Sequence, residues 1–241
     1  FDIPLLVDPL SQLRSDAYDA IIENYDNLIV REDCPEFDAV IRFGRWPVSK
    51  RLTTAIQNFA PTQIVVDPFE TRDFTSSTSV FITMEPSDFV ASLLAEASIA
   101  KQATREDTAS GQVSTPYIQE WNILNKQETQ RILGAKTNPD SSFEGSYVSA
   151  LIGALPAHSL LFSANSMAIR AIDTFYVKQP KRFAVLANRG LNGIDGTLST
   201  AFGAAQAFNQ TVCLTGDLTL LHDLNSLALQ HEMDIRAAEG Y

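Results

Sequence analysis

The sequence predicts an α/β protein built from two doubly wound parallel sheets in series. Three short apolar runs, at residues 160–164, 183–187 and 212–215, end in small or polar residues, and each precedes a helix-like pattern. Residues 37–66 show the same alternation earlier in the chain. Such βαβ order is typical of parallel sheets, which bind ligands at the carboxyl ends of their strands. Functional side chains are therefore expected where strands end and helices begin.

The composition and charge of the chain exclude several function classes. Of its 241 residues, 45% are hydrophobic, enough for one large domain or two modest ones. It contains no apolar run of about 18 residues, so we expect no membrane span. A net charge of −11 argues against nucleic acid as a partner. Because Cys34 and Cys213 lie far apart and the first ten residues do not resemble a signal peptide, we expect a cytoplasmic protein.

The first half of the chain is expected to open with a connecting segment. Residues 1–10 hold two prolines and no periodicity, and a short helix at 15–25 and a short strand at 28–30 are expected to follow. In residues 37–66, FDAVIRFG and QIVV predict strands, and SKRLTTAIQNF between them repeats its apolar residues at helical spacing. SVFITM and PSDFVASLLAEA predict a further strand and helix.

A polar stretch at residues 100–116 predicts the domain boundary, so the two domains are expected at 1–110 and 111–241. The second domain is expected to begin with an amphipathic helix at 117–134, followed by a helix in FEGSYVSALIGALP. The buried face of the amphipathic helix is expected to consist of Tyr117, Trp121, Leu124, Ile132 and Leu133.

The first strand-to-helix junction, ANSMAIR, combines a hydroxyl, free backbone N–H groups and a cation. Ser166 is placed to cap the following helix, and Arg170 projects from the same side of its first turn. This combination suits a carboxylate or a phosphate. On this junction alone, a plain helix cap with Arg170 paired to Asp173 is the favoured alternative.

The second junction, NRGLNGIDG, is rich in glycine. Gly190, Gly193 and Gly196 would let the backbone approach a ligand closely and adopt positive φ angles. Arg189 adds a cation, and its partner is left open between a substrate and Asp195. The spacing does not match GxGxxG, so a dinucleotide site is not supported.

The third junction, GDLTLLHDLN, places a carboxylate directly after a strand. Asp217 follows Gly216 there, where it can bind a hard cation such as Mg²⁺. His222 and Asp223 fall on the next helix, where a surface pair or a capping interaction is the simpler interpretation. The histidines of the chain do not have zinc-ligand spacing.

Taken in order, NSMxIR, ANRGxxGIDG and GDLxxLHDLN resemble a group of thiamine-diphosphate enzymes, the 2-succinyl-5-enolpyruvyl-6-hydroxy-3-cyclohexene-1-carboxylate synthases of menaquinone biosynthesis. FGRWPVSKRL is similar to a strand, loop and helix of the family's central domain, and FDIPLLVDP to the linker before it. The resemblance covers nearly the whole chain. It implies a central domain followed by an incomplete diphosphate-binding domain, without the amino-terminal pyrimidine-binding domain.

The resemblance implies an enzyme that uses thiamine diphosphate and Mg²⁺ to decarboxylate 2-oxoglutarate and to add the succinyl carbanion equivalent to isochorismate. It also implies a homodimer or homotetramer as the full-length enzyme. Carried over position by position, it implies Asp217 as the metal ligand. The implied cofactor-binding residues are Gly193, Ile194, Gly216, Asp217 and Leu218. The implied substrate-binding residues are Lys50, Arg51, Ser166, Arg170 and Arg189.

Two departures from the family pattern imply that this chain alone is catalytically silent and does not bind the thiamine diphosphate and Mg²⁺ of the full-length enzyme. The glutamate that activates the cofactor lies on the pyrimidine domain, so no catalytic residue is assigned here. HEMDI runs directly into RAAEGY where the family has a further strand and the second Mg²⁺ ligand, so we expect a missing stretch near residues 235–237. Two alternatives stay open: another thiamine-diphosphate decarboxylase or carboligase, similar to acetolactate synthase, and a structural or nucleotide-binding domain of that superfamily.

Overall fold

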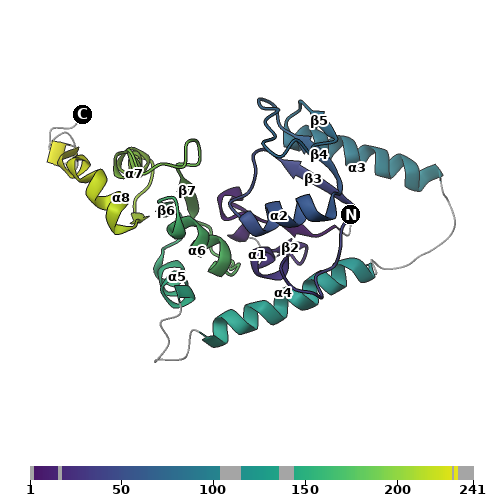
Figure 1. Cartoon of the computed structure of the whole chain (residues 1–241), viewed down its shortest axis with the longest axis horizontal. Coiled ribbons are helices and arrows are strands. Elements are labelled where there is room, and N and C mark those ends of the chain that lie inside the picture. The colour runs from purple at the N-terminus through teal and green to yellow at the C-terminus, as the bar shows by residue number, and fades with distance from the viewer. Residues whose placement is uncertain (1–2, 16–17, 104–114, 136–143, 230, 233–241) are drawn as a thin grey trace.

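A computed structural model describes five segments of the chain, residues 3–15, 18–103, 115–135, 144–229 and 231–232. They form an α/β fold with two three-stranded parallel sheets, as the sequence predicts. Figure 1 shows the sheets side by side, with α4 (Pro116–Ala135) running along one flank of the molecule. Among the described helices, none is long and apolar enough to cross a membrane. Residues 104–114 and 235–237 lie outside the described segments, so the predicted domain boundary and missing stretch stay predictions.

The first sheet has the strand order β3-β4-β5. Its strands are β3 (Ala39–Phe43), β4 (Thr62–Val66) and β5 (Val80–Ile82). The helix α2 (Lys50–Phe59) connects β3 to β4 and buries Leu52, Ala55 and Ile56. The helix α3 (Pro86–Ala103) follows β5. The helical spacing and both strand patterns of this unit are therefore confirmed.

The second sheet has the order β7-β6-β8 and carries helices on both faces. Its strands are β6 (Leu160–Ser163), β7 (Ala184–Ala187) and β8 (Thr211–Leu214). Leu161 packs in a core with α5 (Glu144–Ala154) and α6 (Met167–Phe175). Phe162 points to the opposite side and packs with α7 (Thr197–Ala205). Neighbouring residues of β6 are thus buried on both faces, as expected for the central strand of a doubly wound sheet.

The amino-terminal segment corrects two predictions. Residues 5–6 form β1 (Leu5–Leu6), which pairs in parallel with β2 (Ile21–Ile22), so this segment is part of the fold and the helix predicted at 15–25 is wrong. The strand predicted at 28–30 is also wrong, because Leu28 ends the short helix α1 (Tyr25–Leu28). Ile22, Tyr25 and Leu28 are fully buried against α2 and α4. Tertiary packing therefore decides these elements and overrides local propensity. Two 3₁₀ turns complete the segment, η1 (Pro9–Ser11) and η2 (Leu13–Ser15).

The buried face of α4 is almost as predicted. Trp121, Leu124 and Ile132 are buried, whereas Leu133 is 44% exposed. The reason is angular: residues 121 and 132 share one helix face, and residue 133 is rotated from it by about 100°. Asn125 occupies the face instead and donates from Nδ2 to the buried carboxylate of Glu23 over 2.8 Å.

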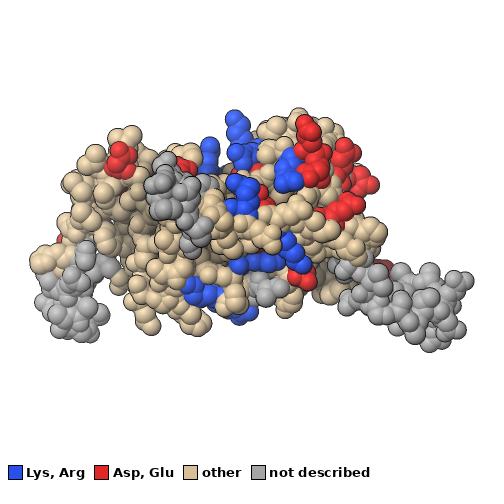
Figure 2. Space-filling model, turned by 90° about the horizontal axis from the view of Figure 1, so that it is seen from below, with Lys and Arg blue, Asp and Glu red and all other residues tan. Residues whose placement is uncertain are grey.

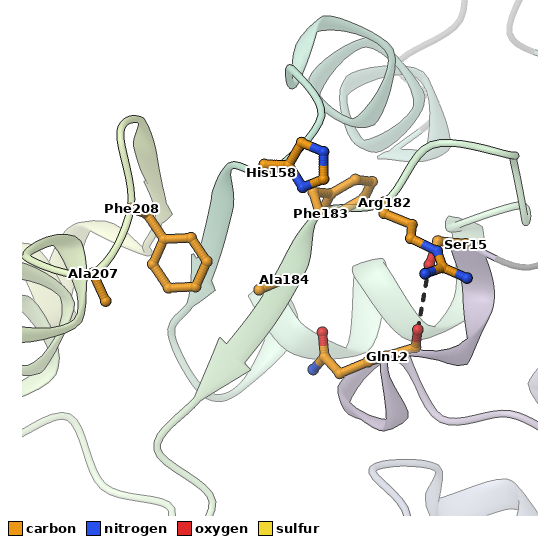
Figure 3. Close-up of a pocket in the computed structure, with 8 residues that line it drawn as sticks. All are labelled: Gln12, Ser15, His158, Arg182, Phe183, Ala184, Ala207 and Phe208. Atoms are coloured by element: carbon orange, nitrogen blue, oxygen red, sulfur yellow. Dashed lines mark hydrogen bonds between the residues drawn. The ribbon is translucent and has the colours of Figure 1, made fainter.

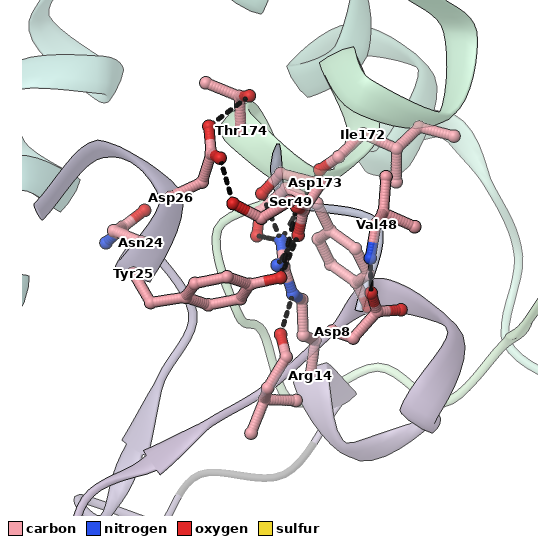
Figure 4. A network of polar contacts seen from close by, with 12 residues as sticks. Asp8, Arg14, Asn24, Tyr25, Asp26, Val48, Ser49, Ile172, Asp173 and Thr174 are labelled. Carbon is pink, nitrogen blue, oxygen red and sulfur yellow. Dashed lines mark hydrogen bonds and ion pairs between the residues drawn. The ribbon is translucent and has the colours of Figure 1, made fainter. Parts of the chain in front are cut away.

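A buried ion pair joins the amino-terminal segment to α6 (Figure 4). Arg14 is 1% exposed, and its Nη2 donates to Asp173 Oδ1 over 2.6 Å. Its other nitrogens donate to the carbonyl oxygens of Val7 and Tyr176, at 2.8 and 3.0 Å. The Tyr25 hydroxyl donates to the same carboxylate over 2.9 Å. Burial raises the pKa of Asp173 to about 7, although Arg14 and Tyr25 act in the opposite direction.

We predict that Asp173→Ala destabilises the fold by about 3–5 kcal/mol, because it leaves the Arg14 guanidinium buried without its carboxylate. Urea unfolding followed by circular dichroism measures the change. The matched control is Asp33→Ala, which breaks the exposed ion pair between Asp33 and Arg31 and is expected to destabilise the fold far less than Asp173→Ala. Equal losses in the two variants would contradict the prediction.

The raised pKa of Asp173 predicts a pH dependence. In the unfolded chain this carboxyl titrates at about 3.9. Between about pH 4 and 7 the folded state therefore binds more protons, so the contribution of Asp173 to the free energy of unfolding falls as pH rises. We expect the advantage of the wild-type protein over Asp173→Asn to shrink between about pH 4.5 and 7.5 in urea titrations. An advantage that grows with pH would show that Arg14 outweighs burial.

Candidate functional site at the carboxyl edge of the second sheet

The three predicted junctions meet at one edge of the second sheet. Ser163, the last residue of β6, lies opposite Ala187 of β7 and Leu214 of β8. All three strands therefore end at the same level. The chain proceeds from β6 outward to β7 and then to β8 on the other side, and sheets of this topology bind ligands beside the strand at which the direction changes.

Asn165 ties the first junction to the second. It is 6% exposed; its Nδ2 donates to the Gly193 carbonyl and its Oδ1 accepts from Arg189 Nη1, both over 2.8 Å. Arg189 is thus turned toward the first junction and not toward Asp195, which lies 3.3 Å from His222 Nδ1. The residue pattern of the first junction does not by itself give Asn165 a role. The signal that could have identified it is an amide two positions after a buried strand.

Two arginines bring positive charge to this edge. The pKa of Arg189 is lowered, first by burial and then by the charge of Arg170, while Asp8 acts in the opposite direction. Arg170 is exposed on α6, and the alternative that pairs it with Asp173 is wrong because Asp173 faces inward to Arg14. An anion that contacts both arginines would relieve their repulsion.

Ser166 does not cap α6 as predicted. It adopts φ +62° and ψ −132°, and its side chain makes no capping hydrogen bond. A positive φ is uncommon for residues other than glycine, and such strain concentrates at functional sites. Because the Ser166 side chain caps none of the first N–H groups of α6, they are available to an anion.

The glycine-rich loop differs from prediction in its backbone. Of its three glycines only Gly196 has a positive φ, +64°, and Asn192 supplies the other left-handed position at +58°. A Cβ at Gly190 would meet no described atom within 4 Å, and one at Gly193 would make only ordinary contact, 3.8 Å from Asp195 Oδ2. Packing inside the described chain therefore does not require glycine at 190 or 193. This leaves room for a ligand to approach the loop backbone.

Asp217 stands at the carboxyl end of β8, where it begins α8 (Asp217–His222). Its side chain is exposed, and Oδ1 accepts a hydrogen bond from the Leu218 N–H over 2.8 Å. The described residues contain no cluster of three histidines, cysteines or acids that could hold a metal. Mg²⁺ in proteins commonly uses one or two carboxylates together with phosphate oxygens and water. Asp217 fits that pattern as a single ligand.

The remaining predicted cofactor residues surround this edge. Gly216 and Leu218 flank Asp217, and the Leu218 side chain is 70% exposed. Ile194 is half-buried and follows Gly193. The carbonyl oxygen of Gly193 accepts the hydrogen bond from Asn165 Nδ2. The surface pair and capping interaction expected after Asp217 are both present. His222 faces Asp195, and Asp223 Oδ2 accepts from the N–H groups of the first turn of α7 at 2.8 and 3.0 Å.

Lys50 and Arg51 lie on the other sheet unit, in the first turn of α2. Both are exposed, and Arg51 Nη1 lies 3.3 Å from Asp26 Oδ2. The loop before them is held by Asp8, whose Oδ2 accepts from the Val48 N–H over 2.7 Å. Figure 2 shows basic side chains gathered across the middle of one face and acidic ones toward one end. Although the net charge of the chain is −11, its basic side chains are concentrated on one part of this face.

A hollow of about 570 Å³ opens at the opposite edge of the second sheet (Figure 3). His158, Arg182 and Phe208 line it, and they precede β6, β7 and β8. No predicted site residue contributes to it. Because parallel sheets bind ligands at the carboxyl ends of their strands, this hollow is not the candidate site.

Comparison with known proteins finds sequence relatives. No family model matches the chain. Curated proteins named 2-succinyl-5-enolpyruvyl-6-hydroxy-3-cyclohexene-1-carboxylate synthase match nearly all of it. That of Lactococcus lactis subsp. lactis is 39% identical over 96% of this chain and 40% of its own length. Those of Bacillus pumilus and Oceanobacillus iheyensis are 39% and 35% identical, over 97% and 93% of this chain.

The chain is a relative of these synthases. The resemblance that the three junction motifs carry is therefore confirmed. The chain spans about two fifths of the length of the curated synthases, 38–40% of each of the three.

Proposed function

We propose that this chain is part of a thiamine-diphosphate-dependent synthase, whose full-length form decarboxylates 2-oxoglutarate and adds its succinyl unit to isochorismate. The observation that carries the proposal is the convergence at one sheet edge of Arg170, Arg189 and Asp217 with the first N–H groups of α6. A carboxylate-binding group and a metal-binding carboxylate are the two features that this chemistry requires of the chain. The sequence relation to the synthases supports the same reaction.

In this proposal the arginines bind substrate carboxylates. Both substrates carry two carboxylates, so several cations are needed at one site. Arg189 is half-buried and its orientation is fixed by Asn165, which strengthens a charge-assisted hydrogen bond and reduces the freedom lost on binding. Arg170 and Ser166 would complete the group at the start of α6. Lys50 and Arg51 would reach the substrate from α2.

Asp217 would hold Mg²⁺, and through it the diphosphate, at the end of β8. Gly193, Ile194, Gly216 and Leu218 would surround the cofactor. Thiamine diphosphate, when bound, supplies the electron sink for decarboxylation, and the residues of this chain orient the substrate and balance its charge. The homodimer or homotetramer and the cytoplasmic location stay predictions.

The alternative carboligase reaction, with pyruvate as donor, is less well supported. Pyruvate carries one carboxylate and would leave part of the Arg170 and Arg189 pair without a partner. The two donors therefore distinguish the two reactions by binding alone.

We predict that Arg189→Leu weakens binding of 2-oxoglutarate by roughly 10- to 150-fold, because a hydrogen bond to a charged group contributes about 1.5–3 kcal/mol. Isothermal titration calorimetry with thiamine diphosphate and Mg²⁺ present measures the dissociation constant. Arg31→Leu is the matched control, since Arg31 pairs with Asp33 on the surface, and it is expected to leave binding unchanged. Pyruvate binding as tight as that of 2-oxoglutarate, or no effect of Arg189→Leu, would contradict the proposal.

A further inference from the structure

We propose that Asp26 is a positioning residue that fixes the Arg51 cation of α2 relative to α6. The inference rests on the proposed function where it concerns substrate, and on the contacts of Asp26 where it concerns geometry. Asp26 lies in α1 and is 7% exposed. It is outside both sheets and outside the three junctions.

The carboxylate of Asp26 joins three helices (Figure 4). Its Oδ1 accepts a hydrogen bond from Ser49 Oγ over 2.6 Å, at the start of α2. Its Oδ2 accepts from Thr174 Oγ1 over 3.0 Å, in the last turn of α6. The same oxygen lies 3.3 Å from Arg51 Nη1. Both oxygens of one side chain in α1 are thus occupied by donors from α2 and α6.

The contact with Ser49 fixes the beginning of α2. Ser49 is the N-cap residue, and its Oγ accepts from the Leu52 N–H over 3.0 Å. The Ser49 hydroxyl has one proton and two lone pairs, so it accepts from Leu52 and at the same time donates its proton to Asp26, which fixes the rotation of the hydroxyl. Asp26 therefore orients the cap and, with it, the turn that carries Lys50 and Arg51.

The contact with Arg51 holds one end of its guanidinium. Besides Asp26 Oδ2, Nη1 lies 3.4 Å from the Asp26 carbonyl and 3.4 Å from Asn27 Oδ1. The Nε and Nη2 groups of Arg51 make no hydrogen bond to the described part of the chain, and the side chain is 51% exposed. One nitrogen is thus anchored, and the rest of the fork is free to bind an anion.

The contact with Thr174 relates this anchor to the second sheet unit. Asn27 Nδ2 also donates to the Thr174 carbonyl, over 3.2 Å, so α1 is attached to α6 at two points. Arg170 lies on the same helix, one turn earlier. Asp26 thereby sets the separation between Arg51 and Arg170, which come from different sheet units.

The test uses Asp26→Asn in the whole chain. Asparagine keeps one acceptor oxygen, which can still accept from Ser49, and its NH₂ group takes the place of the oxygen that Thr174 and Arg51 contact. The substitution therefore removes both the charge and the acceptor that hold Arg51. In the ligand-free protein we expect the ¹H–¹⁵N heteronuclear NOE of Arg51 Nε–Hε to fall from a rigid to a mobile value. Asp33→Asn, which alters the exposed pair with Arg31, is the control and is expected to leave the Arg51 signal unchanged. An equally rigid Arg51 in Asp26→Asn would overturn the proposal.

A second measurement separates positioning from general stability. We expect Asp26→Asn to weaken 2-oxoglutarate binding several-fold in calorimetry, Asp26→Glu to restore part of it, and Asp26→Asn to add nothing in an Arg51→Ala background. A full additional loss in that background would overturn the proposal. If wild-type protein binds no 2-oxoglutarate while the NOE of Arg51 depends on Asp26, the proposed function fails and the positioning role stands. Should Asp26→Asn not fold, Asp26→Glu replaces it, with a smaller expected fall in the Arg51 NOE, because the charge is kept but displaced from Arg51.

Discussion

The pairing of one buried carboxylate, Asp173, constrains the rest of this structure. A carboxyl group that has lost its water needs compensating donors, and Asp173 obtains them from Arg14 and Tyr25. Arg14 and Asp173 are 159 positions apart in the chain. The need to pair this group therefore holds the amino-terminal segment against α6. It also brings the first sheet unit, through α1 and α2, against the second.

The contacts between the two sheet units also position residues of the candidate site. Asp173 draws one face of α6 inward, whereas Arg170 on the same helix lies exposed. Asp8 holds the loop before α2 and contributes to the electrostatics of Arg189. Asp26 holds the start of α2. Three acidic side chains between the two sheet units thus contact or influence cations on both sides, so a chain of net charge −11 can still concentrate cations locally.

Most of the regular fold could be predicted from the sequence because its signals are local. Leu160, Leu161 and Phe162 form an unbroken apolar run, which a central strand buried on both faces requires. Leu52, Ala55 and Ile56 repeat at helical spacing, which one buried helix face requires. The position of Asp217 after β8 follows from the same strand pattern.

The remaining features depend on contacts between distant residues and could not be predicted. The burial of Tyr25 and Leu28 against α2 and α4 replaces the helix and strand expected between residues 15 and 30. Ser166 has the residue type of a helix cap but a backbone conformation that does not use it. The orientation of Arg189 is fixed by its hydrogen bond to Asn165, 24 positions away, and no local sequence pattern indicates that contact.

In the proposed function, both sheet units contribute cations to one dicarboxylate ligand. Backbone amide chemical shifts of the ¹⁵N-labelled chain, followed during titration with 2-oxoglutarate, test this joint binding. We predict that the amides of Arg51 at the start of α2, and those of Asn165, Arg170 and Arg189, shift together with a single dissociation constant. Shifts confined to one unit, or two groups of shifts with different dissociation constants, would contradict it.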